Sequence, residues 1–207
     1  MSSWHDVISS VRSNFSPAID KKSAAELYFP IDGLTNSYAY EIFPGLSDSA
    51  LTELSNNYSL WIPAQYLDFL RCTNGMNLFD KKMCIAGMGY DPLLYRNCKV
   101  PTALQYVDSH RTKETPKNWL FFAVCLDWNG YEKVHVCFDL SSDRNTYTVH
   151  CVSYDNNNIL KSWESFNEWF CEEHSTLNAL FQAQQYEIID IVPGLLKRLR
   201  FRTQSNL

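Results

Sequence analysis

The chain has 207 residues, of which 45% are hydrophobic and 20% are charged. This length suits one domain with a sizeable core, and the apolar content excludes a largely disordered chain. No run of 18 apolar residues occurs, so we expect no membrane-spanning helix. The first residues form no secretory signal, and the seven cysteines include no Cys-x-x-Cys pair. Both features are typical of a cytoplasmic protein with reduced thiols.

The net charge of −5 is unevenly distributed along the sequence. Residues 197–207 carry four basic side chains and no acidic one. The other 196 residues therefore hold 14 basic and 23 acidic side chains, a net charge of −9. An acidic body repels nucleic acid and attracts a basic partner. We therefore expect no direct contact with nucleic acid.

The first 46 residues predict one clear helix and little else. Apolar side chains recur at helical spacing from Trp4 to Val11, and Pro17 ends that segment. Residues 21–29 suggest a short second helix, and residues 31–46 suggest a strand with loops.

Two stronger helices are predicted over 48–58 and 64–74. Ser47 is a good N-cap for the first, and Pro63 suits the opening turn of the second. Asn74-Gly75 is a helix-stop signal, because glycine accepts a left-handed backbone.

After residue 80 the apolar period changes from helical to alternating, which predicts strands. Asn129-Gly130 between two alternating runs is a tight-turn signal for a hairpin. A short helix is expected near 103–109, within an irregular segment that spans 89–118. The predicted strands are 83–88, 119–128, 131–140 and 147–154.

A final helix is predicted over 162–174, capped by Ser162, with a helical continuation and a basic tail beyond it. The pattern predicts an α+β fold, in which helices cover one antiparallel sheet of about 4–6 strands. We divide the chain into an extension over 1–45, a core domain over 46–174 and a C-terminal helical extension over 175–207.

Four cysteine and histidine side chains on the predicted strands deserve a test as a metal or catalytic site: Cys125, His135, Cys137 and His150. Structural zinc sites usually show paired ligands at close spacing, and none occurs here. Cysteine is also a common core residue. We therefore expect no metal, no cofactor and no catalytic set, although a small Cys/His-dependent metal hydrolase remains an alternative.

Four motifs in order over residues 46–172 resemble the SUKH superfamily of Smi/Knr-type proteins. The first is the helix that contains Pro63, Tyr66 and Phe69 and ends at Asn74-Gly75. A strand ending in glycine follows over 83–89. The third is a central hairpin with Asp139 at the usual acidic position, and the last is a closing helix with Ser165, Phe166 and Trp169.

This resemblance implies a SUKH-like fold and two classes of binding protein. One class is the bacterial immunity protein, which neutralises a cognate toxin, often a nuclease with a basic surface, by covering its active or substrate-binding surface. The other class is the Smi/Knr-type regulatory interaction protein. The acidic body and the missing catalytic motif favour a non-enzymatic immunity protein. We expect it to be a monomer or a weak homodimer.

Three surfaces are candidates for binding the toxin. We favour the hairpin side, where Trp128 would protrude beside the turn, with Asp127, Trp128, Asn129, Asp143 and Asp155. The helix face of Glu164, Glu168 and Glu172 is the second candidate. The third is the irregular segment 89–116, with Asp91, Tyr95 and Asp108.

Overall fold

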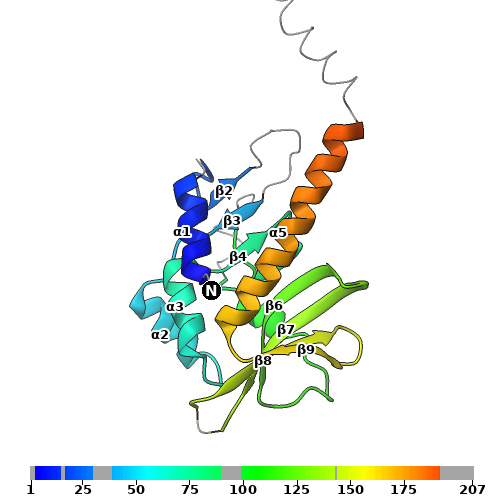
Figure 1. Cartoon of the computed structure of the whole chain (residues 1–207). Helices are drawn as coiled ribbons and strands as arrows, with labels where there is room; N and C mark the ends of the chain where they lie inside the picture. Colours follow the sequence, from blue (N-terminus) through cyan, green and yellow to red (C-terminus); the bar gives the residue numbers. More distant parts are fainter. Residues whose placement is uncertain (1–2, 15–16, 30–38, 90–98, 143, 192–207) are drawn as a thin grey trace, which may run out of the picture. The chain divides into compact units, whose positions relative to one another are not determined.

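One antiparallel sheet organises the chain in the computed structural model (Figure 1). The structure describes residues 3–14, 17–29, 39–89, 99–142 and 144–191, with side chains as far as Phe181 in the last helix. Within these residues the sheet has nine strands, and each strand pairs with its neighbours in sequence. The strands are β1 (Ala18–Ile19), β2 (Glu26–Tyr28), β3 (Tyr40–Ile42), β4 (Met76–Leu78), β5 (Met83–Ile85), β6 (Trp119–Trp128), β7 (Tyr131–Leu140), β8 (Tyr147–Ser153) and β9 (Ile159–Trp163).

Five helices occur in the same described ranges. They are α1 (Trp4–Asn14), α2 (Asp48–Asn56), α3 (Ala64–Cys72), α4 (Leu104–Asp108) and α5 (Phe166–Ile191). The chain divides into two compact units, Met1–Cys171 and Glu172–Leu207. The first unit contains the whole sheet and the first turns of α5, and the second contains the remainder of that helix.

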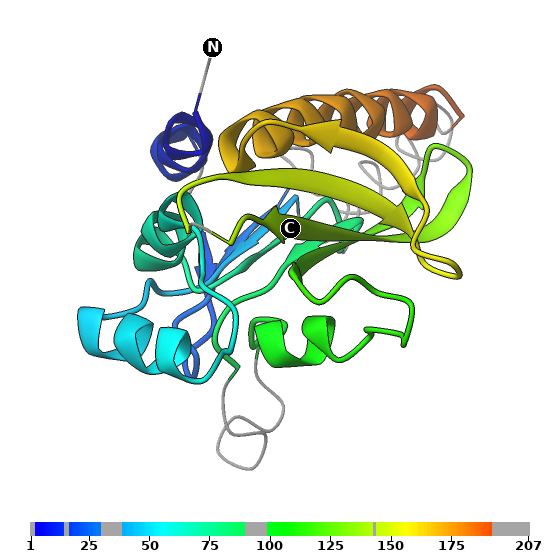
Figure 2. The same ribbon diagram turned by 90° about the horizontal axis from the view of Figure 1, so that it is seen from below.

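Aromatic side chains join α3 to one face of the sheet. Tyr66 lies 5.4 Å from the rings of both Phe122 and Phe138, which stack on each other at 4.0 Å. Phe166 at the start of α5 contacts Tyr66 and Phe69 from the same side. We call this side the α3 face. The opposite side, the α4 face, carries α4, as Figure 2 shows.

Local sequence signals explain where α2 and α3 begin and end. The Ser47 hydroxyl accepts a hydrogen bond from the Ala50 N–H, which caps α2 as predicted. After α3, Gly75 adopts a φ of +80°, and a methyl group there would lie 2.7 Å from the Ile85 carbonyl oxygen. The predicted stop signal therefore also allows β5 to approach closely.

The sheet is larger than the predicted 4–6 strands because β1, β2, β4 and β9 were not expected, whereas β3 lies within 31–46, where a strand was predicted. β1 to β4 contain two or three residues each, too few to show an alternating pattern. The predicted helix over 21–29 is wrong, because this segment contains β2.

The closing helix also begins later than predicted. Residues 159–163 form β9, and the helix starts at Phe166 rather than at 162. Ser165, not Ser162, acts as the cap, since its hydroxyl accepts the Glu168 N–H at 3.1 Å. The prediction failed because Trp163 fits the apolar spacing of the helix as well as that of the strand.

Candidate functional site

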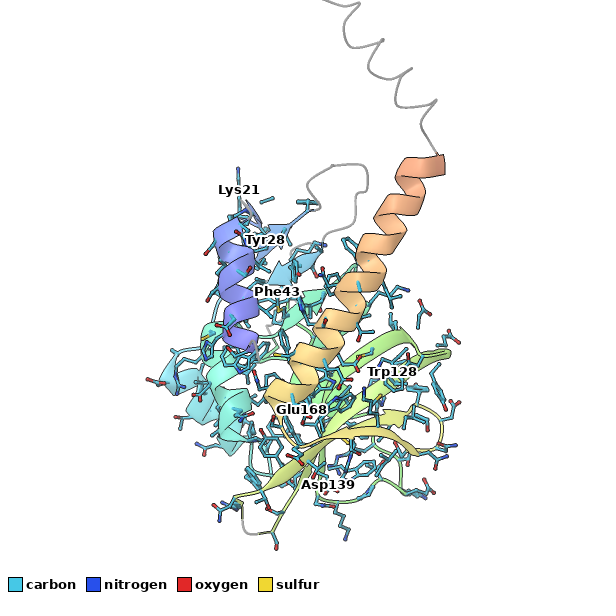
Figure 3. The ribbon with its side chains drawn as sticks, in the orientation of Figure 1. Lys21, Tyr28, Phe43, Trp128, Asp139 and Glu168 are labelled. Atoms are coloured by element: carbon cyan, nitrogen blue, oxygen red, sulfur yellow. The ribbon has the colours of Figure 1, made fainter. Side chains whose placement is uncertain are left out.

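The hairpin between β6 and β7 ends in the predicted tight turn. Asn129 and Gly130 have φ values of +45° and +87°, as a two-residue turn with positive φ at both positions requires. Asp127 beside it forms an ion pair with Lys82. Trp128 does not protrude, because only 9% of its surface is exposed. Figure 3 shows Trp128 and Asp139 near opposite ends of this hairpin.

Exposed apolar side chains surround this end of the sheet instead. Tyr131 is 43% exposed, Tyr154 44% and Ile159 51%, and Leu126 is also exposed. The turn after β8 carries the exposed Asp155, and Glu132 is exposed on β7. We call this group the meander-end surface: Leu126, Asp127, Tyr131, Glu132, Tyr154, Asp155 and Ile159.

A buried histidine, His135, packs beneath the meander-end surface. His135 is only 1% exposed, and its ring lies 5.1 Å from that of Tyr154 and 5.0 Å from that of His110. Burial lowers the pKa of His135 to about 4, so the ring is neutral near pH 7. The Lys133 ammonium lies 4.3 Å above the Tyr154 ring, an arrangement that favours a cation–π contact. Together these contacts hold the Tyr154 ring in place.

The other predicted binding residues have local roles or lie elsewhere. Asp108 pairs with Arg111 at 3.0 Å and accepts the Phe121 N–H, so it ties α4 to β6. Glu168 accepts the Glu164 N–H at the start of α5. Glu172 begins the second unit. Asp91, Tyr95 and Asp143 lie outside the described residues.

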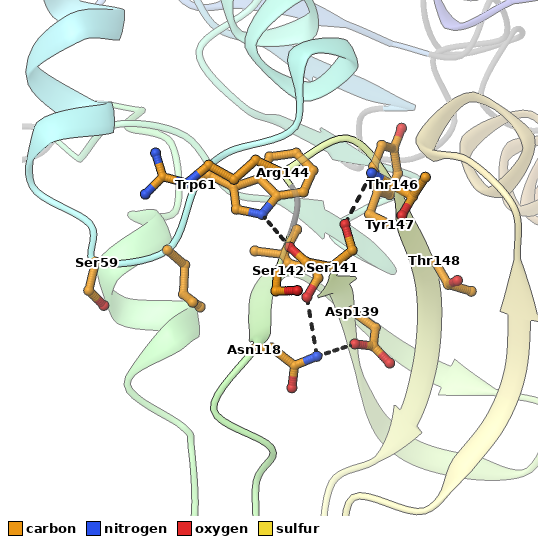
Figure 4. A pocket seen from close by; sticks show the side chains of 12 residues that line it. Ser59, Trp61, Asn118, Asp139, Ser141, Ser142, Arg144, Thr146, Tyr147 and Thr148 are labelled. Atoms are coloured by element: carbon orange, nitrogen blue, oxygen red, sulfur yellow. Dashed lines mark hydrogen bonds between the residues drawn. The ribbon is translucent and has the colours of Figure 1, made fainter.

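A cavity of about 690 Å³ opens at the other end of the meander, beside the turn between β7 and β8 (Figure 4). The connector before α3 forms one wall, where the Trp61 indole N–H donates to the Ser141 carbonyl oxygen at 3.0 Å. Tyr147 is a second aromatic wall, and its hydroxyl donates to Gln65. The remaining lining is mostly polar: Ser59, Leu60, Asn118, Asp139, Leu140, Ser141, Ser142, Arg144, Thr146 and Thr148.

A row of polar side chains runs from this cavity across three strands. Asn118 donates to one oxygen of Asp139 at 2.5 Å, and the Nε2 atom of His150 lies 3.3 Å from the other. The Nδ1 atom of His150 lies 2.8 Å from the Ser162 hydroxyl. The strand register aligns this row, because His150 pairs with both Cys137 and Ser162. The sequence alone could not reveal this row, because its alignment depends on the pairing registers of β7 with β8 and of β8 with β9.

The four cysteine and histidine residues weighed as a metal site do not converge. His135 and Cys137 lie on the α4 face, whereas Cys125 pairs with Val134 on the α3 face. Burial raises the pKa of Cys137 well above its usual value, which keeps the thiol protonated. Among the described residues, no group of three or more potential metal ligands is found.

Comparison with known proteins places the chain in a family. No helix in the described ranges is long and apolar enough to cross a membrane. No curated protein and no solved structure gives a significant match. Residues 45–172 match the SMI1 / KNR4 family (SUKH-1), whose members are generally non-catalytic and which includes proteins of the immunity and Smi1/Knr4 types. This match covers more than half of the sequence and contains the four motifs noted above, so the chain belongs to the SMI1 / KNR4 family (SUKH-1).

Proposed function

We propose that this protein is a cytoplasmic, non-catalytic immunity protein that binds a cognate bacterial toxin. The meander-end surface carries the proposal, because four exposed apolar side chains gather there on adjoining strands. Protein interfaces commonly combine an aromatic centre with a polar rim. Tyr131 and Tyr154 supply the aromatic centre, and Asp127, Glu132 and Asp155 lie around it.

The overall charge supports a basic toxin such as a nuclease. A surface that binds phosphates must be basic, and an acidic inhibitor complements it. The net charge of −9 outside residues 197–207 suits such a partner. The meander-end surface itself is mixed, since Lys82 and Lys133 accompany its three carboxylates. We therefore expect apolar contacts to dominate the affinity and charge to affect mainly the association rate.

Co-expression with the toxin encoded beside this gene tests the proposal. The parent protein should restore growth. Tyr154→Ser should weaken toxin binding by about 2 kcal/mol or more, a loss of roughly 30-fold, if Tyr154 is a buried anchor of the complex. Ile19→Ser is the matched control, because Ile19 is as exposed but lies on β1 at the far edge of the sheet.

Two results would count against the proposal. If Tyr154→Ser and Tyr131→Ser bind the toxin like the parent, the interface lies elsewhere on the molecule. If the parent restores growth against no neighbouring toxin but binds a host protein, the regulatory class of the family is the better description.

A further inference from the structure

We propose that Asn157 is a positioning residue for partner binding, because it ties the turn that carries Tyr154 to the segment that follows α4. The inference rests on the proposed function, since it concerns how the meander-end surface is held ready for a partner. It assigns a role in binding to residues that lie outside this surface.

The turn between β8 and β9 is closed by its own hydrogen bonds. The Ser153 N–H donates to the Asn158 carbonyl oxygen at 3.0 Å, and the Asn157 N–H donates to the Ser153 carbonyl oxygen at 3.1 Å. The Ser153 hydroxyl accepts the Asn158 N–H at 3.0 Å and donates to the Asn156 side chain. Because these bonds link both ends of the turn, the backbone that carries Tyr154 is held in one conformation.

The Asn157 side chain connects this turn to the segment between α4 and β6. Its amide group donates one hydrogen bond to the Thr112 hydroxyl at 3.1 Å and one to the Thr115 hydroxyl at 3.0 Å. A side-chain amide has two N–H donors, so both are used. The Thr115 hydroxyl also accepts the Thr112 N–H at 2.9 Å, and Thr115 is only 7% exposed. We call Thr112, Thr115 and Asn157 the Asn157 clasp.

The same segment also contacts the Tyr154 ring. His110 follows α4 and precedes Thr112 in the chain, and its ring centroid lies 6.2 Å from that of Tyr154. The Nδ1 atom of His110 lies 3.0 Å from the Tyr106 carbonyl oxygen, which fixes the imidazole against α4. The segment therefore holds the turn at two points, through the clasp and through the ring of Tyr154.

This restraint should strengthen binding, because Tyr154 is 44% exposed and is the proposed anchor of the interface. A side chain or loop that becomes ordered only on binding loses conformational freedom at that step, which weakens the affinity. A ring that is already held in place avoids this loss. Removing the clasp should therefore weaken toxin binding roughly three- to tenfold, less than removing the Tyr154 ring itself.

The backbone of Asn157 allows the clasp to be removed without changing the turn. Its φ is +56°, in the left-handed region that asparagine tolerates and glycine adopts freely. Asn157→Gly therefore deletes the amide group and keeps the backbone conformation.

The test measures the affinity of the full chain for an inactive form of the toxin encoded beside this gene. Asn157→Gly and Thr115→Val, which removes the hydroxyl and keeps the shape of the side chain, should each weaken binding roughly three- to tenfold. Thr115→Ser is the matched control, because it keeps the hydroxyl, and it should bind like the parent. Urea unfolding of each variant checks that the fold is retained.

A double-mutant cycle separates the positioning of Tyr154 from a general structural role of the clasp. Asn157→Gly should change binding by less than about twofold when Tyr154→Ser is already present, since the ring that the clasp positions is then missing. NMR order parameters of the backbone amides at 154–156 should fall in Thr115→Val and stay unchanged in Thr115→Ser.

Two sets of outcomes distinguish this inference from the proposed function. If Tyr154→Ser loses affinity but both clasp variants bind like the parent, the interface stands and the positioning role is overturned. An equal loss from Asn157→Gly in the parent and in Tyr154→Ser, or unchanged order parameters in Thr115→Val, would also overturn that role alone. If the parent does not bind the toxin, or if Tyr154→Ser binds it like the parent, the proposed interface is wrong and this inference fails with it.

Discussion

Two phenylalanine rings lie at the centre of the core, and truncating either one should destabilise the fold. Phe69 and Phe166 are fully buried, and their ring centroids lie 5.2 Å apart. Truncating either to alanine leaves a cavity, so we expect a loss of about 3–5 kcal/mol in the free energy of unfolding. Urea denaturation would measure it. Tyr106→Ala, which truncates an exposed ring, is the control, and equal midpoints for all three variants would contradict this packing.

His135 should make stability depend on pH. Its pKa is about 4 in the folded chain against an ordinary value of 6.5. Between these values the unfolded chain binds a proton that the folded chain does not, so stability falls as the pH is lowered through this window. Within this window His135 should change the free energy of unfolding by about 1.4 kcal/mol per pH unit.

Urea unfolding at several pH values from 4 to 7 would check the contribution of His135. The slope should be smaller in His135→Phe than in the parent, and the curves should run parallel above pH 6.5. His5→Gln is the control for loss of an exposed imidazole. Identical slopes in the parent and in His135→Phe would show that His135 is protonated in the folded state.

Individual site residues were only partly predictable from the sequence. The tight turn at Asn129-Gly130 was predicted correctly, but the expected anchor beside it, Trp128, is almost fully covered. Tyr131 and Tyr154 are exposed instead. An alternating strand does not say which of its faces other elements cover, so the sequence could not distinguish these rings from core residues.

Gly75 and Gly130 have similar backbone conformations but different surroundings. Substituting each by alanine therefore separates the cost of a strained backbone from the cost of steric crowding. Gly75 and Gly130 have φ values of +80° and +87°, but a methyl group at Gly130 would meet nothing within 4 Å. Gly130→Ala should therefore cost only the left-handed backbone, about 1–2 kcal/mol. Gly75→Ala should cost clearly more, because the methyl group also meets the Ile85 carbonyl oxygen.

Thermal and urea unfolding of Gly75→Ala and Gly130→Ala would measure the two losses of stability. Equal losses would mean that β5 moves away from the new methyl group at little cost.

Strand length decided which strand bounds could be predicted, since the three-residue β5 was expected over 83–88 but ends at Ile85. β6, β7 and β8 have seven to ten residues, and their predicted bounds agree with the structure within one residue. Such strands show several alternations between buried and exposed positions. β1 to β4 show at most one alternation, and their place in the sheet depends on pairing with partners elsewhere in the chain.

At the scale of the whole molecule, the sheet crosses the boundary proposed at residue 45. β3 pairs with β4, and buried Glu41 accepts a hydrogen bond from Asn77 at 2.5 Å across that pair. Trp4 of α1 also lies 5.6 Å from the Phe69 ring. We therefore propose that the extension over 1–45 folds together with the core rather than apart from it.

Deleting residues 1–45 should expose the edge of β4 and reduce stability and solubility. An uncovered strand edge is a template for association, so the shortened chain should form larger species on size exclusion. A monodisperse product with an unchanged unfolding midpoint would show that the first three strands are dispensable.

The order of the strands has a consequence for synthesis on the ribosome. Because every strand pairs with the one made just before it, each new strand finds its partner already present as the chain emerges. Pairing within the hairpins from β6 to β9 closes short loops and favours rapid folding, whereas β3–β4 and β5–β6 are joined through the long segments 43–75 and 86–118. One long-range contact comes late, when the Asn167 side chain accepts the Trp4 N–H at 3.0 Å. Until Asn167 is made, the start of α1 lacks this partner, so α1 should reach its final position only once α5 has begun to form, although Trp4 can pack on Phe69 earlier.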